Sequence, residues 1–506
     1  MKVKQTYKNI LINLVAFALH LGISLYTSPI LIKALGKESY GFIGLANDFV
    51  NYLTIITTVF NSVAARFIAV EMARGEVKKA EKYFNSLLAT NLVLGSIFLV
   101  TGILVVANVE VLFDVPVYLI TDVRVTFGLS FLTFIVGITT SIFTTAAFAK
   151  NRLDINGFRN ILQYVIRLIC IVILLSFKVL HIYYVSFASL LAAITVAVMN
   201  INIKKKLMPE VRVAPKEASL REIRILASAG VWLAITNLSS MLMRGLDLLV
   251  ANKFMGAYEM SLLSVARTFP NAFSSAVATL APIFTPVFIM HWAQKHKDKL
   301  VDSVVDSIKT MGLLMIVPVS GFIVFSNAFY TLWQKSYSQD EIMIITALSS
   351  ITVMQCYFNS TTAAMAQMSV VVNKLKLPVL VSFGCGIFNL ICVITLLKFT
   401  NLGVFAIVIP STVILILRYV LFNSFYCAHI ISHSPKTFLF TCFKVWLTIP
   451  VQIGLMYGMK QLFKTDNWTG FLIGAFVCGV TGYIVQFFLV EGKNSIHMIK
   501  KFLKKE

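Results

Sequence analysis

Charged side chains are scarce in this sequence. Asp, Glu, Lys and Arg make up 13% of the 506 residues, whereas hydrophobic residues make up 58%. So few charges cannot cover the surface of soluble domains of this total length. The composition therefore excludes a soluble protein and indicates a polytopic helical membrane protein.

Paired cysteines are absent as well. The seven cysteines lie inside apolar runs or at their edges and form no Cys-x-x-Cys pair. A disulfide framework or a zinc site is therefore not expected, and we predict no metal and no cofactor. The apolar run after the basic N-terminus is too long for a signal peptide and lacks a clear cleavage site, so we interpret it as the first transmembrane helix.

Acidic residues are outnumbered by basic ones, which gives a formal net charge of +22. Most basic residues lie in short loops beside apolar runs, so they are expected to set membrane topology rather than to bind nucleic acid. Lys and Arg are about three times as numerous in the segments on the N-terminal side of the membrane as in those on the opposite side. This bias predicts that both termini are cytosolic.

Fourteen apolar segments are long enough, or nearly so, to cross a bilayer core of ~30 Å at ~1.5 Å per residue. They cover residues 10–34, 41–65, 83–107, 118–148, 160–177, 182–203, 225–251, 260–290, 303–328, 341–368, 377–397, 402–426, 437–460 and 467–490. We predict an all-α polytopic membrane protein, with about 14 transmembrane helices in two pseudo-symmetric six-helix lobes plus two C-terminal helices.

A basic segment with prolines separates the first six spans from the rest. We therefore divide the chain into an N-terminal lobe (1–206), a cytosolic basic linker (207–224), a C-terminal lobe (225–430), and spans 13–14 with a cytosolic tail (431–506). A weak repeat relates the lobes at an offset of 220 residues. The matched pairs include Lys33 with Lys253, Gly36 with Gly256, Ala46 with Ala266, and Phe49 with Phe269. Each half holds an even number of spans, which predicts copies of the same orientation, as in parallel-repeat transporters.

Polar residues recur at three- and four-residue steps in spans 1, 2, 7 and 8, so they share one face of each helix. The stripes include His20, Ser24 and Thr27; Gly44, Asn47, Asn51, Thr54 and Asn61; Asn237, Ser240, Arg244 and Asp247; and Ser264, Arg267, Asn271 and Ser274. Such stripes are unfavourable against lipid, which favours a central hydrophilic cavity. The alternative is that they form interhelical hydrogen bonds.

Each charge within the spans has a structural alternative. Arg244 and Asp247 are three residues apart and can neutralise each other. Arg267 can pair with Asp48 as a gate or bind an anion. Arg167 lies two turns from the cytosolic end of its span, which favours snorkelling slightly over a role in a cavity.

Short motifs in both halves point to a known family. The pattern Arg-x-x-Asp-x-Leu-Val at 244–250, followed by Met255-Gly256 and Ala266, resembles the second-lobe signature of polysaccharide flippases. These belong to the multidrug/oligosaccharidyl-lipid/polysaccharide exporter superfamily. The segment 29–41 resembles the first-lobe signature, and Gly384, Asn389 and Gly403 resemble the pattern of spans 11 and 12.

The resemblance implies a V-shaped pair of lobes with spans 1, 2, 7 and 8 lining a cavity. It also implies a flippase in the bacterial inner (plasma) membrane. The cargo would be an oligosaccharide repeat unit on undecaprenyl pyrophosphate, moved from the cytosolic to the outer leaflet for a surface polysaccharide such as the O-antigen of lipopolysaccharide. Transport would proceed by alternating access of the lobes, with Na+ or H+ as possible coupling ions.

The chemistry of the stripes fits such a cargo. Arginine offers a fork of donors to a pyrophosphate, and amides and hydroxyls bind sugars. The candidate substrate-binding residues are Arg244, Arg267, Asn47, Asn51, Asn271, Ser274, Ser240, Asn237 and Arg167, and the candidate ion-coupling residues are Asp247 and Asp48. We predict that Arg244 and Arg267 together hold the pyrophosphate.

Three alternatives remain open at this stage. A multidrug/cation antiporter of the same superfamily typically has twelve spans, so spans 13 and 14 argue against it. A peptidoglycan-precursor flippase is not excluded. A membrane polysaccharide polymerase or ligase would need a sizeable external loop, and no such loop is predicted, so we do not expect an enzyme. The expected partners of the monomer are the lipid-linked oligosaccharide, membrane lipids and a polymerase of the same pathway.

Overall fold

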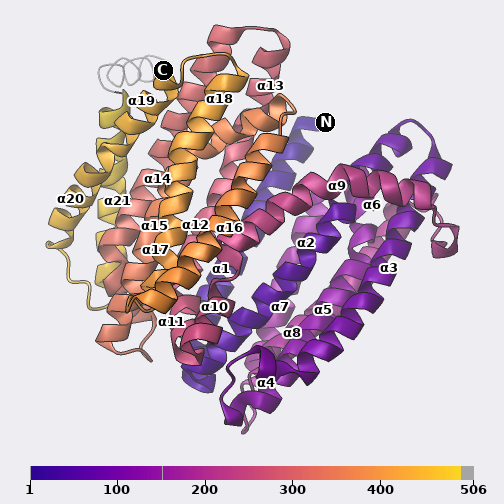
Figure 1. Cartoon of the computed structure of the whole chain (residues 1–506), viewed down its shortest axis with the longest axis horizontal. Coiled ribbons are helices and arrows are strands. Elements are labelled where there is room, and N and C mark those ends of the chain that lie inside the picture. Colours follow the sequence, from indigo (N-terminus) through magenta and orange to yellow (C-terminus); the bar gives the residue numbers. More distant parts are fainter. Residues whose placement is uncertain (1, 151, 492–506) are drawn as a thin grey trace. The chain divides into compact units, whose positions relative to one another are not determined.

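The structure is a computed structural model that describes residues 2–150 and 152–491. The predicted cytosolic tail from residue 492 onward lies outside the described residues. The chain forms two compact units, residues 1–264 and 265–506, which we call unit 1 and unit 2 and describe separately (Figure 1). Regular structure in the described ranges is helical throughout.

Unit 1 contains the helices up to α11, the last of which ends two residues beyond it. They are α1 (Lys2–Leu35), α2 (Lys37–Ala73), α3 (Val77–Ala107), α4 (Val109–Leu112), η1 (Val117–Leu119), α5 (Ile120–Ser141), η2 (Ile142–Thr144), α6 (Thr145–Ala149), α7 (Leu153–Leu174), α8 (Tyr183–Leu207), η3 (Pro215–Glu217), α9 (Leu220–Ser240), the π-helical η4 (Met241–Gly245), α10 (Asp247–Met255) and α11 (Ala257–Ala266).

Unit 2 contains the remaining helices. They are α12 (Thr268–Leu280), η5 (Ala281–Phe284), α13 (Thr285–Ala293), α14 (Lys297–Trp333), α15 (Gln339–Val371), α16 (Lys376–Phe399), α17 (Phe405–Leu417), the π-helical η6 (Arg418–Asn423), α18 (Ser424–Ile430), α19 (Pro435–Trp446), α20 (Thr448–Lys460) and α21 (Trp468–Glu491).

Membrane-spanning helices account for most of the chain. In the described part, 13 helices are long and apolar enough to cross a membrane, or up to 14 when the segments Lys37–Thr57 and Val59–Ala73, bent by 47°, count as one span. The predicted all-α polytopic fold class is therefore confirmed. The hydropathy of ~20-residue segments carries this information directly, because a membrane-crossing helix must satisfy its own backbone hydrogen bonds.

The eighth predicted span is broken in the structure. The sequence predicts an unbroken span over 260–290, whereas α11 ends at Ala266, α12 begins at Thr268, and the candidate span begins only there. Pro270 has no N–H to donate to the carbonyl of Ala266, so the helical ladder is interrupted at this point. The break falls at Arg267, in the middle of one predicted polar stripe.

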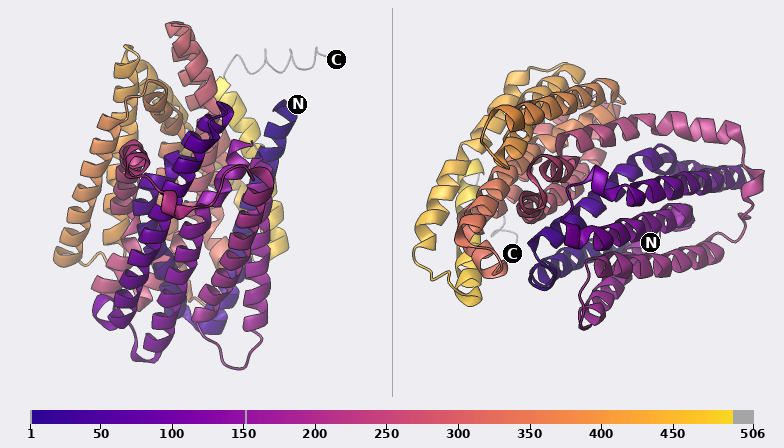
Figure 2. Two further views of the ribbon diagram at one scale, coloured as in Figure 1. Left: turned by 90° about the vertical axis from the view of Figure 1, so that its right-hand side faces the viewer. Right: turned by 60° about the horizontal axis from the view of Figure 1, so that its bottom comes forward.

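Unit 1 is a layered bundle around α2. This helix packs against α3, α5, α6 and α9, while α5 packs on α8 and α1 runs along α7 (Figure 2). A partly buried amide network joins α2, α3 and α5. Asn61 Nδ2 donates to Asn91 Oδ1 (3.2 Å), Asn91 Nδ2 donates to Asn61 Oδ1 (3.1 Å), and the Ser141 hydroxyl donates to Asn61 Oδ1 (3.0 Å). For Asn61, therefore, the interhelical hydrogen bond is the observed role.

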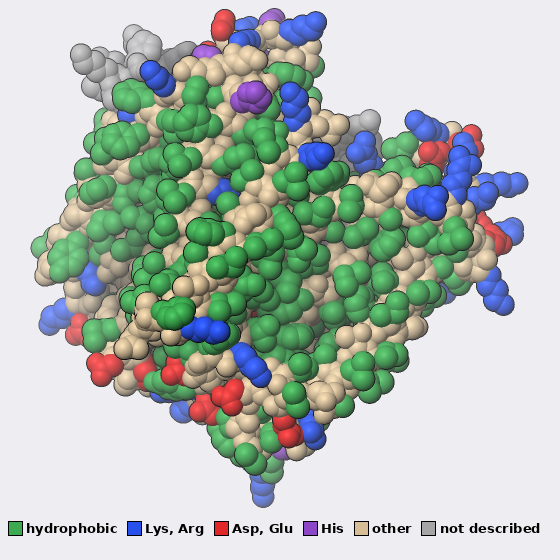
Figure 3. Space-filling view, in the orientation of Figure 1, with side chains coloured by type: hydrophobic (Ala, Val, Ile, Leu, Met, Phe, Trp, Pro, Cys, Tyr) green, Lys and Arg blue, Asp and Glu red, His purple; other side chains and the backbone are tan. Residues whose placement is uncertain are grey.

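The segment after α8 is held against α3 of unit 1 by hydrogen bonds. The Asn85 side chain on α3 donates to the carbonyl of Arg212 (3.1 Å) and accepts from the N–H of Ala214 (2.8 Å). Further along, the N–H of Ser219 donates to the Ser86 hydroxyl (2.9 Å). Lys and Arg side chains gather on the surface of unit 1 around this segment (Figure 3).

Helix α9 continues from this segment and crosses α2 at Gly230. A Cβ atom on Gly230 would lie 1.7 Å from the carbonyl oxygen of Val59, so only glycine allows this approach. Together with the fastened segment, this crossing explains why α9 to α11 belong to the first compact unit, although the sequence assigns them to the C-terminal lobe. The lobe boundaries stay a prediction.

Unit 2 is organised around α14, which packs against α15, α19, α20 and α21. Gly312 of α14 lies so close to α19 that a Cβ atom would be 2.3 Å from Val445 Cγ1. Predicted span 13 corresponds to α19 with α20 and predicted span 14 to α21. Helices α20 and α21 are joined by a buried hydrogen bond of 3.0 Å from Gln452 Nε2 to Gln486 Oε1. The two C-terminal helices are thus an integral part of this unit.

Candidate functional site

The two turns paired by the sequence repeat have the same backbone geometry. Gly36 separates α1 from α2 with φ +93°, and Gly256 separates α10 from α11 with φ +107°. Each glycine N–H donates to a carbonyl four residues earlier at 3.0 Å. Both take a conformation that L side chains rarely adopt, which is why the repeat places glycine there.

The helices that follow these turns pack against each other at small residues. A Cβ atom on Gly41 would lie 2.9 Å from Met260 Cε, and one on Gly44 would lie 2.6 Å from the Ser264 hydroxyl. Helices α2 and α11 are therefore in close contact next to the two turns. Gly44 and Ser264, at this contact, also line a cavity in unit 1.

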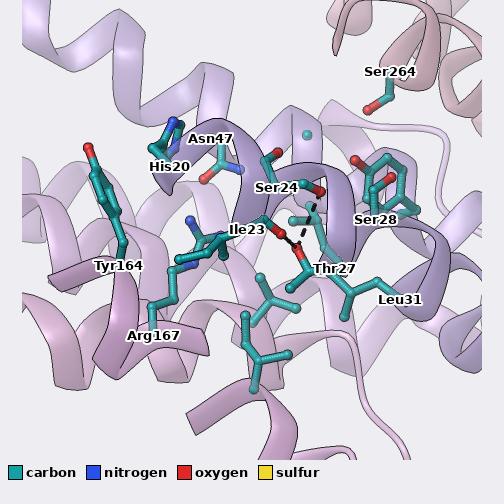
Figure 4. A pocket seen from close by; sticks show the side chains of 15 residues that line it. His20, Ile23, Ser24, Thr27, Ser28, Leu31, Asn47, Tyr164, Arg167 and Ser264 are labelled. Atoms are coloured by element: carbon teal, nitrogen blue, oxygen red, sulfur yellow. Dashed lines mark hydrogen bonds between the residues drawn. The ribbon is translucent and has the colours of Figure 1, made fainter. Parts of the chain in front are cut away.

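The cavity has a volume of about 250 Å³ and lies between α1, α2 and α7 (Figure 4). Its polar lining residues are His20, Ser24, Thr27 and Ser28 of α1, Tyr40 and Asn47 of α2, Tyr164 and Arg167 of α7, and Ser264 of α11. Most of these side chains can donate a hydrogen bond. The cavity therefore suits a ligand rich in oxygen acceptors.

Arg167 gives the cavity its positive charge. Among the described residues, its buried Nε atom has no hydrogen-bond partner. The ionisable groups that act on its charge are Tyr40, Tyr164 and His20, and no Asp or Glu occurs among the described residues of the lining. A guanidinium in a membrane span without a counter-charge is costly, so an anion that enters the cavity gains from this arrangement.

The neighbours of Arg167 are partly committed to other contacts. The Thr27 hydroxyl donates to the carbonyl of Ile23 (2.8 Å) within α1, and the His20 and Tyr164 rings lie 4.6 Å apart. Ser24 and Asn47 present a hydroxyl and an amide to the same space (Figure 4). The cavity thus combines one cation with neutral groups of the kind that bind sugars and phosphates.

Two of the predicted substrate-binding residues, Asn47 and Arg167, line this one cavity. Their role in substrate binding stays a prediction, and so does the choice between a cavity role and snorkelling for Arg167. Asn51 lies one helical turn beyond Asn47 on α2, is exposed, and is not part of the lining. Its neighbour Asp48 is half-buried, and its role in ion coupling stays a prediction.

The predicted residues of α9 and α10 lie around a π-helical turn. Asn237 and Ser240 are exposed, and the Ser240 hydroxyl donates to the carbonyl of Thr236 (3.1 Å). Arg244 belongs to the π-turn Met241–Gly245, and both Arg244 and Asp247 are half-buried. The wider i→i+5 turn means that an α-helical spacing does not describe the face shared by these residues.

Three predicted residues belong to unit 2. Arg267 is half-buried at the break between α11 and α12, and Asn271 is exposed on α12. The Ser274 hydroxyl lies 3.3 Å from Cys356 Sγ of α15. The predicted joint grip of Arg244 and Arg267 on a pyrophosphate stays a prediction.

Ser28, Tyr40 and Tyr164 also line the cavity but were not predicted from the sequence. Tyr164 stands three residues before Arg167 on α7, so the helical period could have placed it on the same face. Tyr40 comes directly after a turn and carries no comparable pattern. Only tertiary packing brings it to Arg167.

Comparisons with known proteins add the family. A family model described as "Polysaccharide biosynthesis protein" matches residues 6–292. The chain is 24% identical over 494 residues to the "Uncharacterized membrane protein EpsK" of Bacillus subtilis (strain 168), with 97% of each chain covered.

Solved structures show the same fold. A lipid II flippase MurJ in an inward closed conformation matches with a TM-score of 0.69 at 14% identity, covering 95% of this chain and 99% of that one. An inward-facing multidrug resistance MATE family transporter of the MOP superfamily matches with a TM-score of 0.70 at 14% identity, covering 84% and 98%. Since the family model spans more than half of the sequence, this chain belongs to the polysaccharide biosynthesis protein family.

Proposed function

We propose that the protein is a flippase that moves an oligosaccharide repeat unit on undecaprenyl pyrophosphate from the cytosolic to the outer leaflet of a bacterial plasma membrane. The family and the fold support transport across a membrane in polysaccharide assembly. The observation that carries the proposal is Arg167, a half-buried residue with a buried Nε atom, which lines a polar cavity whose described lining has no carboxylate.

The pyrophosphate is the part of such a cargo that needs a fixed cation. In the proposal its oxygens accept charge-assisted hydrogen bonds from Arg167, which are favoured in a partly dehydrated site. Ser24 and Asn47 then hydrogen-bond the first sugar. Alternating access requires that the contact of α2 with α11 at Gly41 and Gly44 opens, so that the cargo can leave toward the outer leaflet.

The polar stripe residues that do not line this cavity would act at other steps of transport. Arg244 and Arg267, with Asn51, Asn271, Ser274, Asn237 and Ser240, would contact the cargo at other stages of transport. Asp48 and Asp247 would couple transport to Na+ or H+. These roles differ from that of Arg167 because their substitution should change transport without removing pyrophosphate binding by the resting protein.

Proteoliposomes that contain purified protein and a lipid-linked oligosaccharide test the proposal. A membrane-impermeant glycosidase added outside should cleave material that was loaded in the inner leaflet, and protein-free vesicles should protect it. Formation of new glycosidic bonds by the protein would instead identify a polymerase or ligase. Extrusion of organic cations without any movement of lipid would identify an antiporter. Preferential movement of a peptidoglycan precursor would change the cargo but not the flippase mechanism.

A further inference from the structure

A second hollow lies on the same two helices as Arg167. It has a volume of about 460 Å³, and its lining is Val15, Ala18, Leu19, Gly22, Ile23 and Tyr26 of α1 with Leu168 of α7. Apart from the Tyr26 hydroxyl, these side chains are apolar. Tyr26 is 62% exposed and Val15 is 44% exposed, so the hollow is an open groove rather than an enclosed space. We call it the α1–α7 groove.

The groove and the Arg167 cavity share a wall. Ile23 lines both, and Leu168 of the groove follows Arg167 directly in α7. On α1 the polar residues His20 and Ser24 line the cavity, whereas residues one or two positions away line the groove. The α1–α7 seam therefore separates a cationic polar space from an apolar one.

Gly22 leaves the floor of the groove open. A Cβ atom on Gly22 would meet no atom within 4 Å, so no neighbour requires a glycine there. Glycine is also an unfavourable residue in a helix interior compared with alanine. At the repeat-equivalent position the chain has Leu242, a much larger residue. The missing side chain matters because it provides room.

We propose that the α1–α7 groove holds the polyisoprenoid chain of the lipid whose phosphate head group occupies the Arg167 cavity. This inference rests on the proposed function and names the path of the lipid chain. A cation beside an apolar groove matches an anionic amphiphile, whereas a soluble anion would use only the cavity. The polyisoprenoid chain passes Ile23 between α1 and α7. It stays in the bilayer while the polar part of the lipid moves inside the protein.

The full-length protein in detergent allows a test with two probes, radiolabelled undecaprenyl pyrophosphate and inorganic pyrophosphate. Gly22→Trp fills the groove and should weaken binding of the lipid by at least about tenfold, because the chain loses its buried apolar contact. Binding of inorganic pyrophosphate should not change. Arg167→Gln should weaken both ligands. Gly137→Trp is the matched control, because a Cβ atom there also meets nothing within 4 Å and Gly137 lies on α5, away from the groove.

Each outcome distinguishes the groove from the proposed function. If Gly22→Trp binds the lipid like the unmodified protein while Arg167→Gln loses both ligands, the groove is overturned and the flippase proposal stands. If the unmodified protein binds neither ligand, the flippase proposal fails. An equal loss of both ligands in Gly22→Trp contradicts the groove, and the smaller change Gly22→Leu then shows whether that loss follows from misfolding. Equally effective competition by phosphatidylglycerol would assign the groove to ordinary bilayer lipid and would also overturn the inference.

Discussion

Helices α1 and α2 meet at Gly36, and helices α10 and α11 meet at Gly256, with φ values of +93° and +107°. The backbones of the two pairs match, but their charges do not. The first pair has the neutral Ser24 and Asn47 where the repeat places Arg244 and Arg267, and its cation comes from a third helix as Arg167. The repeat therefore preserves the turn, whereas each copy has its own electrostatics.

The C-terminal ends of α1 and α10 also differ in the contacts of their buried side chains. Asn252, next to the Gly256 turn, is fully buried, and its side chain accepts from the N–H of Asp114 (3.0 Å) and donates to the carbonyl of Asp114 (2.9 Å). The repeat-equivalent residue Ile32 is also buried but apolar. Helix α10 is thus tied to the loop before η1 by hydrogen bonds, whereas the matching buried residue of α1 makes no such bond because its side chain is apolar.

Removal of Arg167, the cation that α7 contributes to the cavity beside the first pair, should have the largest effect. Arg167→Ala removes at least one charge-assisted contact worth about 1.5–3 kcal/mol, so transport in the proteoliposome assay should fall roughly 10- to 100-fold. Arg167→Lys should retain part of the activity, because lysine keeps the charge but loses the fork.

A matched control for this change lies on the same helix. Arg159 donates to Asn200 Oδ1 at 2.7 Å and does not line the cavity, so Arg159→Ala should reach the membrane and transport more than Arg167→Ala. Ser24→Arg in the Arg167→Ala background would give the first pair the cation of the second. A rescue by Ser24→Arg would show that the cavity needs a charge and not a particular helix.

Removal of the Asn252 side-chain amide should have the next largest effect, in this case on stability. Asn252→Ala leaves the N–H and carbonyl of Asp114 without their partners, so the free energy of unfolding should fall by about 2–3 kcal/mol. Ile32→Val, at the equivalent position, removes one buried methylene and should cost about 1 kcal/mol. Thermal unfolding of both variants in one detergent measures the difference, and equal losses would contradict the distinction between the two ends.

The shared turn can be tested by alanine at both glycines. Gly36→Ala and Gly256→Ala each force a side chain into a strained backbone region at a cost of about 1–2 kcal/mol. The loss should be larger at Gly256, because its new Cβ atom would also lie 3.4 Å from Asp114 Oδ2, whereas nothing lies within 4 Å at Gly36. Gly22→Ala is the control, since it sits in a regular helix and should not lower the unfolding temperature.

Single cysteine substitutions, which should have the smallest effect on the protein, test on which side of the membrane the two turns lie. In a background without native cysteines, Lys37→Cys and Tyr258→Cys should both react with an impermeant thiol reagent from outside intact cells, and Lys79→Cys should not. The expected labelling follows from the bias of basic residues toward the N-terminal side. Labelling of only one of the two turns would contradict copies of equal orientation.

The fold could be predicted in large part from the sequence, because membrane helices can be recognised from the length and hydropathy of their segments. The sequence repeat, which pairs Gly256 with Gly36, also indicated that the two turns correspond. Two local features were not predictable: the π-turn at Arg244 and the break at Arg267 change the spacing on which a helical face depends. Neither feature can be predicted from the helical period of the sequence.

The candidate site was predictable only in its parts. Asn47 and Arg167 were among the candidates, but they share a cavity only because α1 packs against both α2 and α7, which no periodic pattern encodes. The same holds for Tyr40, whose neighbour Arg167 is more than a hundred residues away in the chain. Sequence patterns identify which helix faces are polar, whereas tertiary packing decides which of those faces share a cavity.

The most direct test of the account is a cryo-electron microscopy map of the full-length protein in nanodiscs that contain undecaprenyl pyrophosphate. We predict phosphate density at hydrogen-bonding distance, about 2.7–3.2 Å, from the guanidinium of Arg167, with chain density past Ile23 along Gly22. Phosphate density on Arg244 and Arg267 together with an Arg167 cavity that contains only water would contradict the central claim.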